Sequence, residues 1–315
     1  MIKVLVLGQP YWGQRVALAL DAPAEGIRVS FVPQAAYSRL LARPSSDPIL
    51  LMRMGYRIGA TTTRGRLFDA YWFLLRRSLR NAVACHYWLG SDVLDTITEA
   101  RVGTLRRAAL LSTRNDLHLA DAPWLASELE SVGIHAVTAH VPVPHRAPPA
   151  PPPMPARFSV LTYLAANRFE FYGGETILEV ARRLPDVRFD VVGTTGAPNR
   201  QSPPNVRWHG WVTDMPRYYA STTVVVRIPR HDGLGETVVE GLLNARHVLY
   251  THEVPFVQTV WPATPETLVA AIATLRDEHV TERLEANLAG RAYALEEFDE
   301  VRLAGHLAVL LRERA

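Results

Sequence analysis

Two carboxylates lie eight residues apart in a segment whose composition suits a polar, anionic ligand. Asp232 opens the short loop Asp232-Gly-Leu-Gly235, and Glu240 lies within the helix predicted to follow it. The glycines let the backbone approach a ligand closely, and a helix N-terminus favours a negatively charged group. A carboxylate on the sheet-facing side of a helix is costly when it is buried without a partner. We therefore expect Glu240 to have a partner, for example a pair of ligand hydroxyls; two ordinary surface acids are the alternative.

A strand, a helix and a second strand position these residues. The β-branched run from Thr222 to Val226 is typical of a buried parallel strand, which ends at Ile228-Pro229. The helix after the loop has one apolar side, and a second strand from His247 to Tyr250 completes a βαβ-like unit. The apolar residues of that helix are Val238, Val239, Leu242 and Leu243.

The segment HDGLGETVVEGLLNARHVL resembles the E-x7-E segment of retaining glycosyltransferases with the GT-B fold, in the family 4 class. Those sequences typically read acid-Gly-aromatic-Gly, a β-branched run, Glu-Ala and a Gly-x-Pro-Val-Val strand. The resemblance implies that Asp232 holds sugar hydroxyls and that Glu240 holds the nucleotide ribose. It also implies substrate binding by Gly233, Leu234, Gly235, Glu236 and Thr237. Three departures are Asp232 for Glu, Leu234 for the aromatic residue, and Arg246-His247 for the small turn.

A further departure concerns the diphosphate of the donor. The family usually has Gly-Arg, a few residues and then Lys-Gly before the first helix of this domain, and the Arg–Lys pair holds the diphosphate. Here Tyr172 stands at the lysine position, and Arg168 is offset by about one residue from the usual arginine. A guanidinium binds phosphate oxygens in a bidentate way, so Arg168 could supply the charge alone. An ordinary surface arginine on a loop is the alternative.

Two residues of the first half are further candidates. His86 ends the strand predicted from Ala82 to Tyr87, and open α/β sheets place functional groups at such strand ends. The resemblance implies that His86 lines the reacting face near the transferred sugar; a structural histidine is the alternative, and His118 is a weaker candidate. Gly13 follows the first predicted strand, in a turn that lacks the G-x-G-x-x-G spacing. The resemblance implies that Gly13 lies near the donor diphosphate or the acceptor; a plain βα turn is the alternative.

The chain divides into two halves of similar pattern. Each alternates strands and helices, which predicts a parallel sheet, and the proline-dense segment from Val141 to Pro155 predicts an extended linker between them. The resemblance implies an α/β protein of GT-B type, with two Rossmann-like domains facing a cleft. The expected domains are an N-terminal acceptor-side domain, 1–148, which includes a C-terminal helix at about 299–315 that crosses back, and a nucleotide-sugar-binding domain, 156–298.

Composition excludes several mechanisms. Lys3 is the only lysine among 315 residues, which excludes a P-loop NTPase and Schiff-base catalysis. Cys85 is the only cysteine, which excludes an intrachain disulfide and a cysteine-rich zinc site and fits a reducing cytoplasm. The sequence contains no Asp-x-Asp motif, so we expect neither a metal nor a cofactor apart from the donor substrate.

Location and partners follow from hydropathy and charge. No stretch reaches the roughly 18 apolar residues of a spanning helix, and the start MIKVLVLG is too short for a signal-peptide core. We expect a cytoplasmic protein with no nucleic-acid partner. The predicted helix 67–80 combines aromatic bulk with a basic end, so it could contact the inner face of an anionic membrane. A core helix with arginines at its C-terminus is the alternative.

Together these features predict a retaining, metal-independent glycosyltransferase. It would move a sugar from a nucleotide diphosphate sugar, such as a UDP- or GDP-sugar, to an unidentified glycan, lipid or small molecule. A non-catalytic sugar-nucleotide-binding partner protein and a GT-B nucleotide-sugar epimerase are the alternatives.

Overall fold

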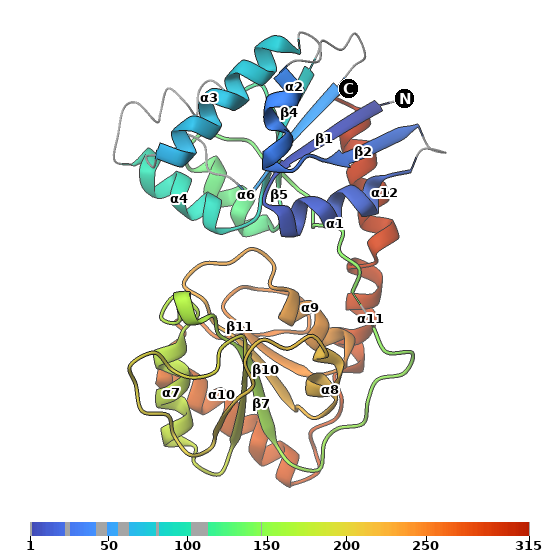
Figure 1. Ribbon diagram of the computed structural model, residues 1–315. Coiled ribbons are helices and arrows are strands. Elements are labelled where there is room, and N and C mark those ends of the chain that lie inside the picture. The colour runs from blue at the N-terminus through green and yellow to red at the C-terminus, as the bar shows by residue number, and fades with distance from the viewer. Residues whose placement is uncertain are drawn as a thin grey trace. The chain divides into compact units, whose positions relative to one another are not determined.

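The computed structural model shows two compact units, each built around a parallel sheet (Figure 1). It describes residues 2–22, 26–41, 49–55, 63–79, 82–101, 113–145 and 147–314, without the side chains of Leu41 and Arg64. Unit 1 comprises residues 1–144, 231–234 and 298–315, and unit 2 comprises residues 145–230 and 235–297. Compared with the predicted domains, residues 145–148 of the linker belong to unit 2 and residues 231–234 belong to unit 1. The predicted helix 67–80 ends outside the described residues, as does Arg80 itself.

The described strands of unit 1 form a six-stranded parallel sheet in the order β2-β1-β3-β4-β5-β6. Their long apolar runs are those of strands covered on both faces. The strands are β1 (Ile2–Gly8), β2 (Ile27–Phe31), β3 (Ile49–Met54), β4 (Ala82–Trp88), β5 (Leu117–Ala120) and β6 (Val137–Thr138).

Helices cover both faces of the unit 1 sheet, and successive residues of β1 alternate between them. Val4 and Val6 pack with α1 (Pro10–Leu20) and α12 (Glu300–Arg312), whereas Leu5 and Leu7 pack with α3 (Thr63–Ser78). Because α12 belongs to this unit, the chain returns to unit 1 after α11 of unit 2. Within the described residues, unit 1 also contains the helices η2 (Gln34–Ala36), α2 (Tyr37–Leu41), α4 (Ser91–Ala100) and α6 (Pro123–Glu130).

The described strands of unit 2 form a second six-stranded parallel sheet, in the order β12-β11-β10-β7-β8-β9. Numbered within the unit, this is the 3-2-1-4-5-6 order of a dinucleotide-binding fold, which reverses direction between β7 and β10. The strands are β7 (Ser159–Tyr163), β8 (Arg188–Val192), β9 (Val206–Trp208), β10 (Val224–Arg227), β11 (His247–Tyr250) and β12 (Gln258–Thr259).

The helices of unit 2 lie on two faces of its sheet. On one face, α7 (Gly174–Arg183) and α10 (Pro265–Val280) bury their apolar residues against Val160, Val224 and Val226. On the other face, Gly241 of α9 (Glu236–Leu243) lies against Val225 and Val248, and α9 contacts α11 (Leu288–Glu297). The unit also contains η3 (Ala166–Arg168) and α8 (Met215–Ala220).

Buried arginines hold the proline-dense linker against unit 2. Arg246 is fully buried, and its guanidinium donates hydrogen bonds to the carbonyl oxygens of Pro152 and Pro153. Arg291 donates to the carbonyl of Pro148, and the His279 ring contacts the carbonyl of Pro155. Proline has no N–H but keeps its carbonyl acceptor, so side-chain donors can hold an extended proline segment in place.

Two helix boundaries differ from those that the sequence predicts, which are a turn through Gly13 with a helix from Val16, and a helix from Thr281 to Leu295. The first helix begins at Pro10, because Pro suits the first turn of a helix, so Gly13 lies inside α1 and not in a turn. The other helix begins at Leu288, since Glu282 adopts a positive φ of 57° directly after α10 ends. Among the described helices, none combines the length and hydropathy needed to cross a bilayer.

Candidate functional site

The strongest candidate site lies where the strand order of unit 2 reverses. Val226 of β10 pairs with Thr162 of β7, so the next residues, Arg227 and Tyr163, end two adjacent strands. Arg227 shares the α9 face with Val225, and its guanidinium carbon lies 6.0 Å from the Tyr163 ring centroid. Ligands of open α/β sheets bind outside the carboxyl ends of strands at such a reversal. Chain topology therefore places these two side chains where a ligand is expected.

Tyr172 lies near two guanidinium groups at this strand edge. The Arg227 guanidinium carbon is 5.1 Å from the Tyr172 ring centroid, and that of Arg168 is 5.8 Å away. Arg168 also lies over the Phe171 ring at 3.8 Å. Aromatic faces attract guanidinium groups, while the N–H donors of arginine point outward in the guanidinium plane. This arrangement thus holds two cations beside one aromatic ring.

Glu240 has a tyrosine as its protein partner. The Tyr219 hydroxyl donates a hydrogen bond of 2.6 Å to Glu240 Oε2, and no other partner of this carboxylate is found among the described residues. Burial raises the pKa of Glu240, the Tyr219 hydrogen bond lowers it, and the charge of Glu236 one helical turn earlier raises it again. Burial also raises the pKa of Tyr219 well above its usual value, so the hydroxyl stays protonated and acts as donor.

The N-terminus of α9 contributes further polar groups to the same part of unit 2. Gly235 is the N-cap residue of α9, and Glu236 and Thr237 begin the helix. The Thr237 hydroxyl oxygen is buried and has no hydrogen-bond partner in the part of the chain described. Buried hydroxyls are nearly always satisfied, so this one is well suited to a ligand contact. Unit 2 thus contains five of the predicted residues: Arg168, Gly235, Glu236, Thr237 and Glu240.

The other predicted residues belong to unit 1. The loop residues Asp232, Gly233 and Leu234 are assigned there, together with His86 and Gly13. Trp124 of α6 donates its indole N–H to the Asp232 carbonyl at 2.8 Å. A side chain at Gly233 would meet the Leu89 carbonyl oxygen at 2.3 Å, so only glycine fits at this position.

His86 lies inside unit 1 in a buried polar cluster. It is 2% exposed, its Nε2 lies 2.8 Å from Asp116 Oδ2, and its ring stacks on that of His118 at 4.8 Å. Burial lowers the pKa of His86 well below its usual value, and the charges of Arg53 and Arg76 lower it further. The ring is therefore neutral and donates Nε2–H to the carboxylate. Of the two roles that the sequence leaves open for His86, this geometry favours the structural one.

Gly13 also serves packing in this structure. It is buried within α1, and a Cβ at this position would lie 2.7 Å from two carbon atoms of the Phe31 ring. Glycine at position 13 therefore allows α1 to approach β2 closely. This packing role agrees with the alternative that Gly13 belongs to an ordinary βα connection.

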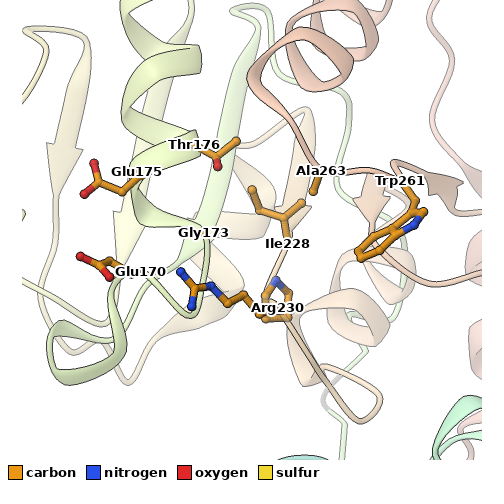
Figure 2. Close-up of a pocket in the computed structure, with 9 residues that line it drawn as sticks. Glu170, Gly173, Glu175, Thr176, Ile228, Arg230, Trp261 and Ala263 are labelled. Atoms are coloured by element: carbon orange, nitrogen blue, oxygen red, sulfur yellow. The ribbon is translucent and has the colours of Figure 1, made fainter. Parts of the chain in front are cut away.

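A cavity of about 550 Å³ lies on the other face of the unit 2 sheet (Figure 2). Its wall includes Ile228, which belongs to the core under α7 and α10, and the exposed indole of Trp261. The carboxylates of Glu170 and Glu175 line it and both form ion pairs with Arg200. In Figure 2 these two carboxylates lie on one side and Trp261 on the other, with Arg230 between. Glu170 and Gly173 of its wall flank Phe171 and Tyr172, so this cavity adjoins the loop that carries Arg168, whereas Arg227 and Glu240 lie on the α9 face.

Sequence reasoning missed Arg227, Tyr163 and Tyr219. One signal was present for Arg227, because a charged residue ends the otherwise apolar run Val-Val-Val-Arg. The tyrosines carry no such signal, since their roles depend on neighbours distant in sequence. Among the described residues, no group of three His, Cys, Asp or Glu side chains is placed to hold a metal ion.

The fold is that of GT-B glycosyltransferases. Three solved structures show it at full length. Anabaena Alr3699/HepE in complex with UDP and glucose has a TM-score of 0.71 and 13% identity, covering 99% of this chain and 100% of that one. Sucrose-phosphate synthase from Thermosynechococcus elongatus has a TM-score of 0.71 and 13% identity, covering 99% of both chains. The lipopolysaccharide outer core galactosyltransferase WaaB has a TM-score of 0.65 and 10% identity, covering 99% of this chain and 100% of that one.

No protein-family model and no curated protein sequence matches this chain. The similarity is therefore one of fold, which extends over both units.

Proposed function

We propose that this protein is a retaining glycosyltransferase that moves a sugar from a nucleotide diphosphate sugar to a glycan, lipid or small-molecule acceptor. The observation that carries the proposal is the cluster of Arg168, Arg227 and Glu240 at the strand reversal of the unit 2 sheet. The similar structures of HepE were solved with UDP and glucose and with UDP-glucose, which supports a uridine nucleotide as the first donor to test.

Each residue of the cluster suits one part of such a donor. Glu240 accepts hydrogen bonds from the ribose hydroxyls, for which a carboxylate with one oxygen held by Tyr219 is well oriented. Arg168 binds the diphosphate, and the backbone amides at the start of α9 add positive potential. Asp232, with the residues that follow it, orients the sugar.

The proposed reaction needs no metal ion. A guanidinium group and a helix N-terminus stabilise the negative charge that develops on a leaving diphosphate. In a retaining reaction of this class, the acceptor attacks from the side that the nucleotide leaves, and the leaving phosphate takes the acceptor proton.

The test is the thermal stability of the protein with a panel of UDP-, GDP-, ADP- and dTDP-sugars. A ligand that binds only the folded state raises the unfolding midpoint by mass action. We expect one nucleotide class to stabilise the wild type and the control Glu278→Gln, a carboxylate change on α10 of the same unit, but not Glu240→Gln. Stabilisation that is equal in Glu240→Gln would remove this residue from the donor site.

A non-catalytic sugar-nucleotide-binding protein is the second candidate, and the tyrosine at position 172 in place of lysine favours it. Release of the nucleoside diphosphate distinguishes the two. The transferase releases it when the stabilising donor is mixed with a lipid and glycan extract, whereas the binding protein returns the donor intact. An epimerase would instead convert the donor sugar without an acceptor.

We also propose that the protein works in the cytoplasm, where α3 contacts an anionic membrane. Phe68, Trp72 and Leu75 of α3 face the core, but positions of helical spacing on the opposite side are all exposed. These are Arg66, Leu67, Ala70, Phe73, Leu74 and Arg77. Asp69, the only acid of α3, pairs with Arg53. An exposed apolar stripe flanked by arginines suits the surface of an anionic bilayer.

Sedimentation with vesicles tests this contact. The wild type should sediment with vesicles of phosphatidylglycerol and phosphatidylcholine but not with phosphatidylcholine alone. Replacing Phe73 and Leu74 by serine should abolish binding, whereas Leu18→Ser, at a still more exposed leucine of α1, should leave it intact. Equal sedimentation of both variants would contradict the proposal.

A further inference from the structure

A donor diphosphate has two phosphate groups, and the family that this sequence resembles holds them with an arginine and a lysine. Tyr172 occupies the lysine position here, so only Arg168 remains of that pair. The inference below rests on the proposed function, because it concerns the same donor site.

Arg227 is the one cation of the described cluster that the family pattern does not contain. It ends β10 on the α9 face, and its guanidinium carbon lies 5.1 Å from the ring centroid of Tyr172. The positive charge that the family pattern has at position 172 is thus replaced by the Arg227 guanidinium, which lies beside Tyr172 and comes from the adjacent strand. Both Arg168 and Arg227 lie within 6 Å of the Tyr172 ring centroid.

The electrostatic surroundings of Arg227 link it to the residues proposed to bind the donor. Its charge acts on the hydroxyl of Tyr219, which holds Glu240, and on that of Tyr163, which ends β7. Arg227 is therefore close to the ribose side of the proposed site as well as to Tyr172. Arg168 approaches Tyr172 from η3, so the two guanidinium groups come from separate elements.

Contact with an aromatic ring does not compete with phosphate binding. The ring contacts the face of a guanidinium group, whereas the N–H donors lie in its plane and bind oxyanions in a bidentate way. A tyrosine in contact with two arginines can therefore orient both of them without neutralising either charge. Lysine at position 172 would instead add a third positive charge beside two arginines.

We propose that Arg227 is the second diphosphate-binding residue, in place of the lysine of the resembling family, and that Tyr172 orients both guanidinium groups. The diphosphate then bridges the ends of two strands on either side of the sheet reversal. The tyrosine is thus part of a rearranged site that keeps its two positive charges.

The experiment compares UDP, uridine and inorganic pyrophosphate as ligands of the wild type and its variants. Arg227→Gln should lower the affinity for UDP and pyrophosphate by about tenfold to a hundredfold, the effect of one lost charge-assisted hydrogen-bond pair. Uridine affinity should be unchanged, which also shows that the variant is folded. Arg227→Lys should retain part of the UDP affinity, because it keeps the charge but loses the bidentate geometry.

Arg182→Gln is the control. Arg182 is an exposed arginine of α7 whose guanidinium pairs with Glu179, so its loss should leave UDP affinity unchanged. The double variant Tyr172→Lys/Arg227→Gln should recover most of the lost UDP affinity, because it restores the family arrangement. A double variant that binds UDP no better than Arg227→Gln would contradict the exchange of roles.

The outcomes separate this inference from the proposed function. If UDP binds and Arg227→Gln leaves the ratio of UDP to uridine affinity unchanged, the inference is wrong and the donor site stands. If pyrophosphate binding depends on Arg227 but no nucleotide binds, the inference stands and the proposed function is wrong. If neither UDP nor pyrophosphate binds the wild type, both are wrong.

Discussion

Replacing Tyr219 by phenylalanine removes one oxygen atom and tests the central contact of the candidate site. The Tyr219 hydroxyl is 2.6 Å from Glu240 Oε2, and the tyrosine is 1% exposed. Hydrogen bonds to charged groups contribute about 1.5–3 kcal/mol to stability, and the variant also leaves the carboxylate without this donor. We expect Tyr219→Phe to lower the free energy of unfolding by about that amount.

The same substitution should change the pH dependence of donor binding. Burial raises the pKa of Glu240 and the Tyr219 hydrogen bond lowers it, so removing the hydroxyl raises that pKa further. A loss of about 1.5 kcal/mol from the ionised form corresponds to about one pH unit. Because an ionised Glu240 is needed to accept two ribose hydroxyls, UDP binding by the variant should fail at a higher pH than that of the wild type.

The free energy of unfolding should also depend on pH through the raised pKa of Glu240. With its pKa raised on folding, Glu240 holds a proton in the native state at pH values where the unfolded chain has released it. The free energy of unfolding therefore decreases as pH rises through the interval between the two pKa values. The interval is wider in Tyr219→Phe, so the decrease should be larger.

Urea denaturation of the wild type, Tyr219→Phe, Glu240→Gln and the double variant measures the coupling directly. Tyr218→Phe is the matched control, since its neighbouring hydroxyl accepts a hydrogen bond from Arg217 and does not contact Glu240. A coupling energy near zero between positions 219 and 240, with unchanged UDP binding, would refute the reasoning.

Two further predictions concern other buried polar groups. Trp88 donates its indole N–H to His118 Nδ1, and burial lowers the pKa of His118 to about 4. Between pH 6.5 and about 4 the unfolded chain therefore binds a proton at His118 that the folded protein does not bind. The free energy of unfolding should fall by about 1.4 kcal/mol for each pH unit of acidification in this range. In urea denaturation of His118→Gln, the pH dependence of the free energy of unfolding should be weaker by about one proton. An unchanged pH dependence would contradict its assignment to His118. Arg246→Met leaves two linker carbonyls without their donor and should cost about 2–3 kcal/mol, measured in the same way against the exposed-arginine control Arg207→Met.

Local patterns in the sequence were sufficient for much of the fold. The strand 247–250 has the predicted bounds, because an apolar run between the polar residues Arg246 and Thr251 defines it. The helix expected from Thr281 shows where local pattern fails. Its sequence favours a helix, but Glu282 has a positive φ, and the amides of Arg283 and Leu284 turn back to the Glu278 carbonyl to end α10. Such termination depends on local C-terminal hydrogen bonds and one left-handed residue, which helix propensity does not include.

The candidate site was predictable only where its residues share one motif. Glu240, Glu236 and Arg168 lie in segments that resemble the family, and the structure places them in unit 2. Tyr219 lies on α8 and Tyr163 ends β7, so only the assembled sheet brings them to Glu240 and Arg227. No spacing rule within a single segment could have identified them.

Tyr172 shows why a motif departure has different meanings in sequence and in structure. In the sequence, the missing lysine indicates weaker binding of the diphosphate, because the motif is compared one position at a time. In a parallel sheet, however, residues at the ends of adjacent strands share one site although they lie far apart in the chain. The strand ends at Tyr163 and Arg227 are adjacent while the residues are distant in sequence, so a charge lost from one loop can be supplied by the neighbouring strand. Diphosphate binding depends on the number of positive charges at the strand edge. The guanidinium groups of Arg168 and Arg227 beside Tyr172 supply two, as many as an arginine–lysine pair would.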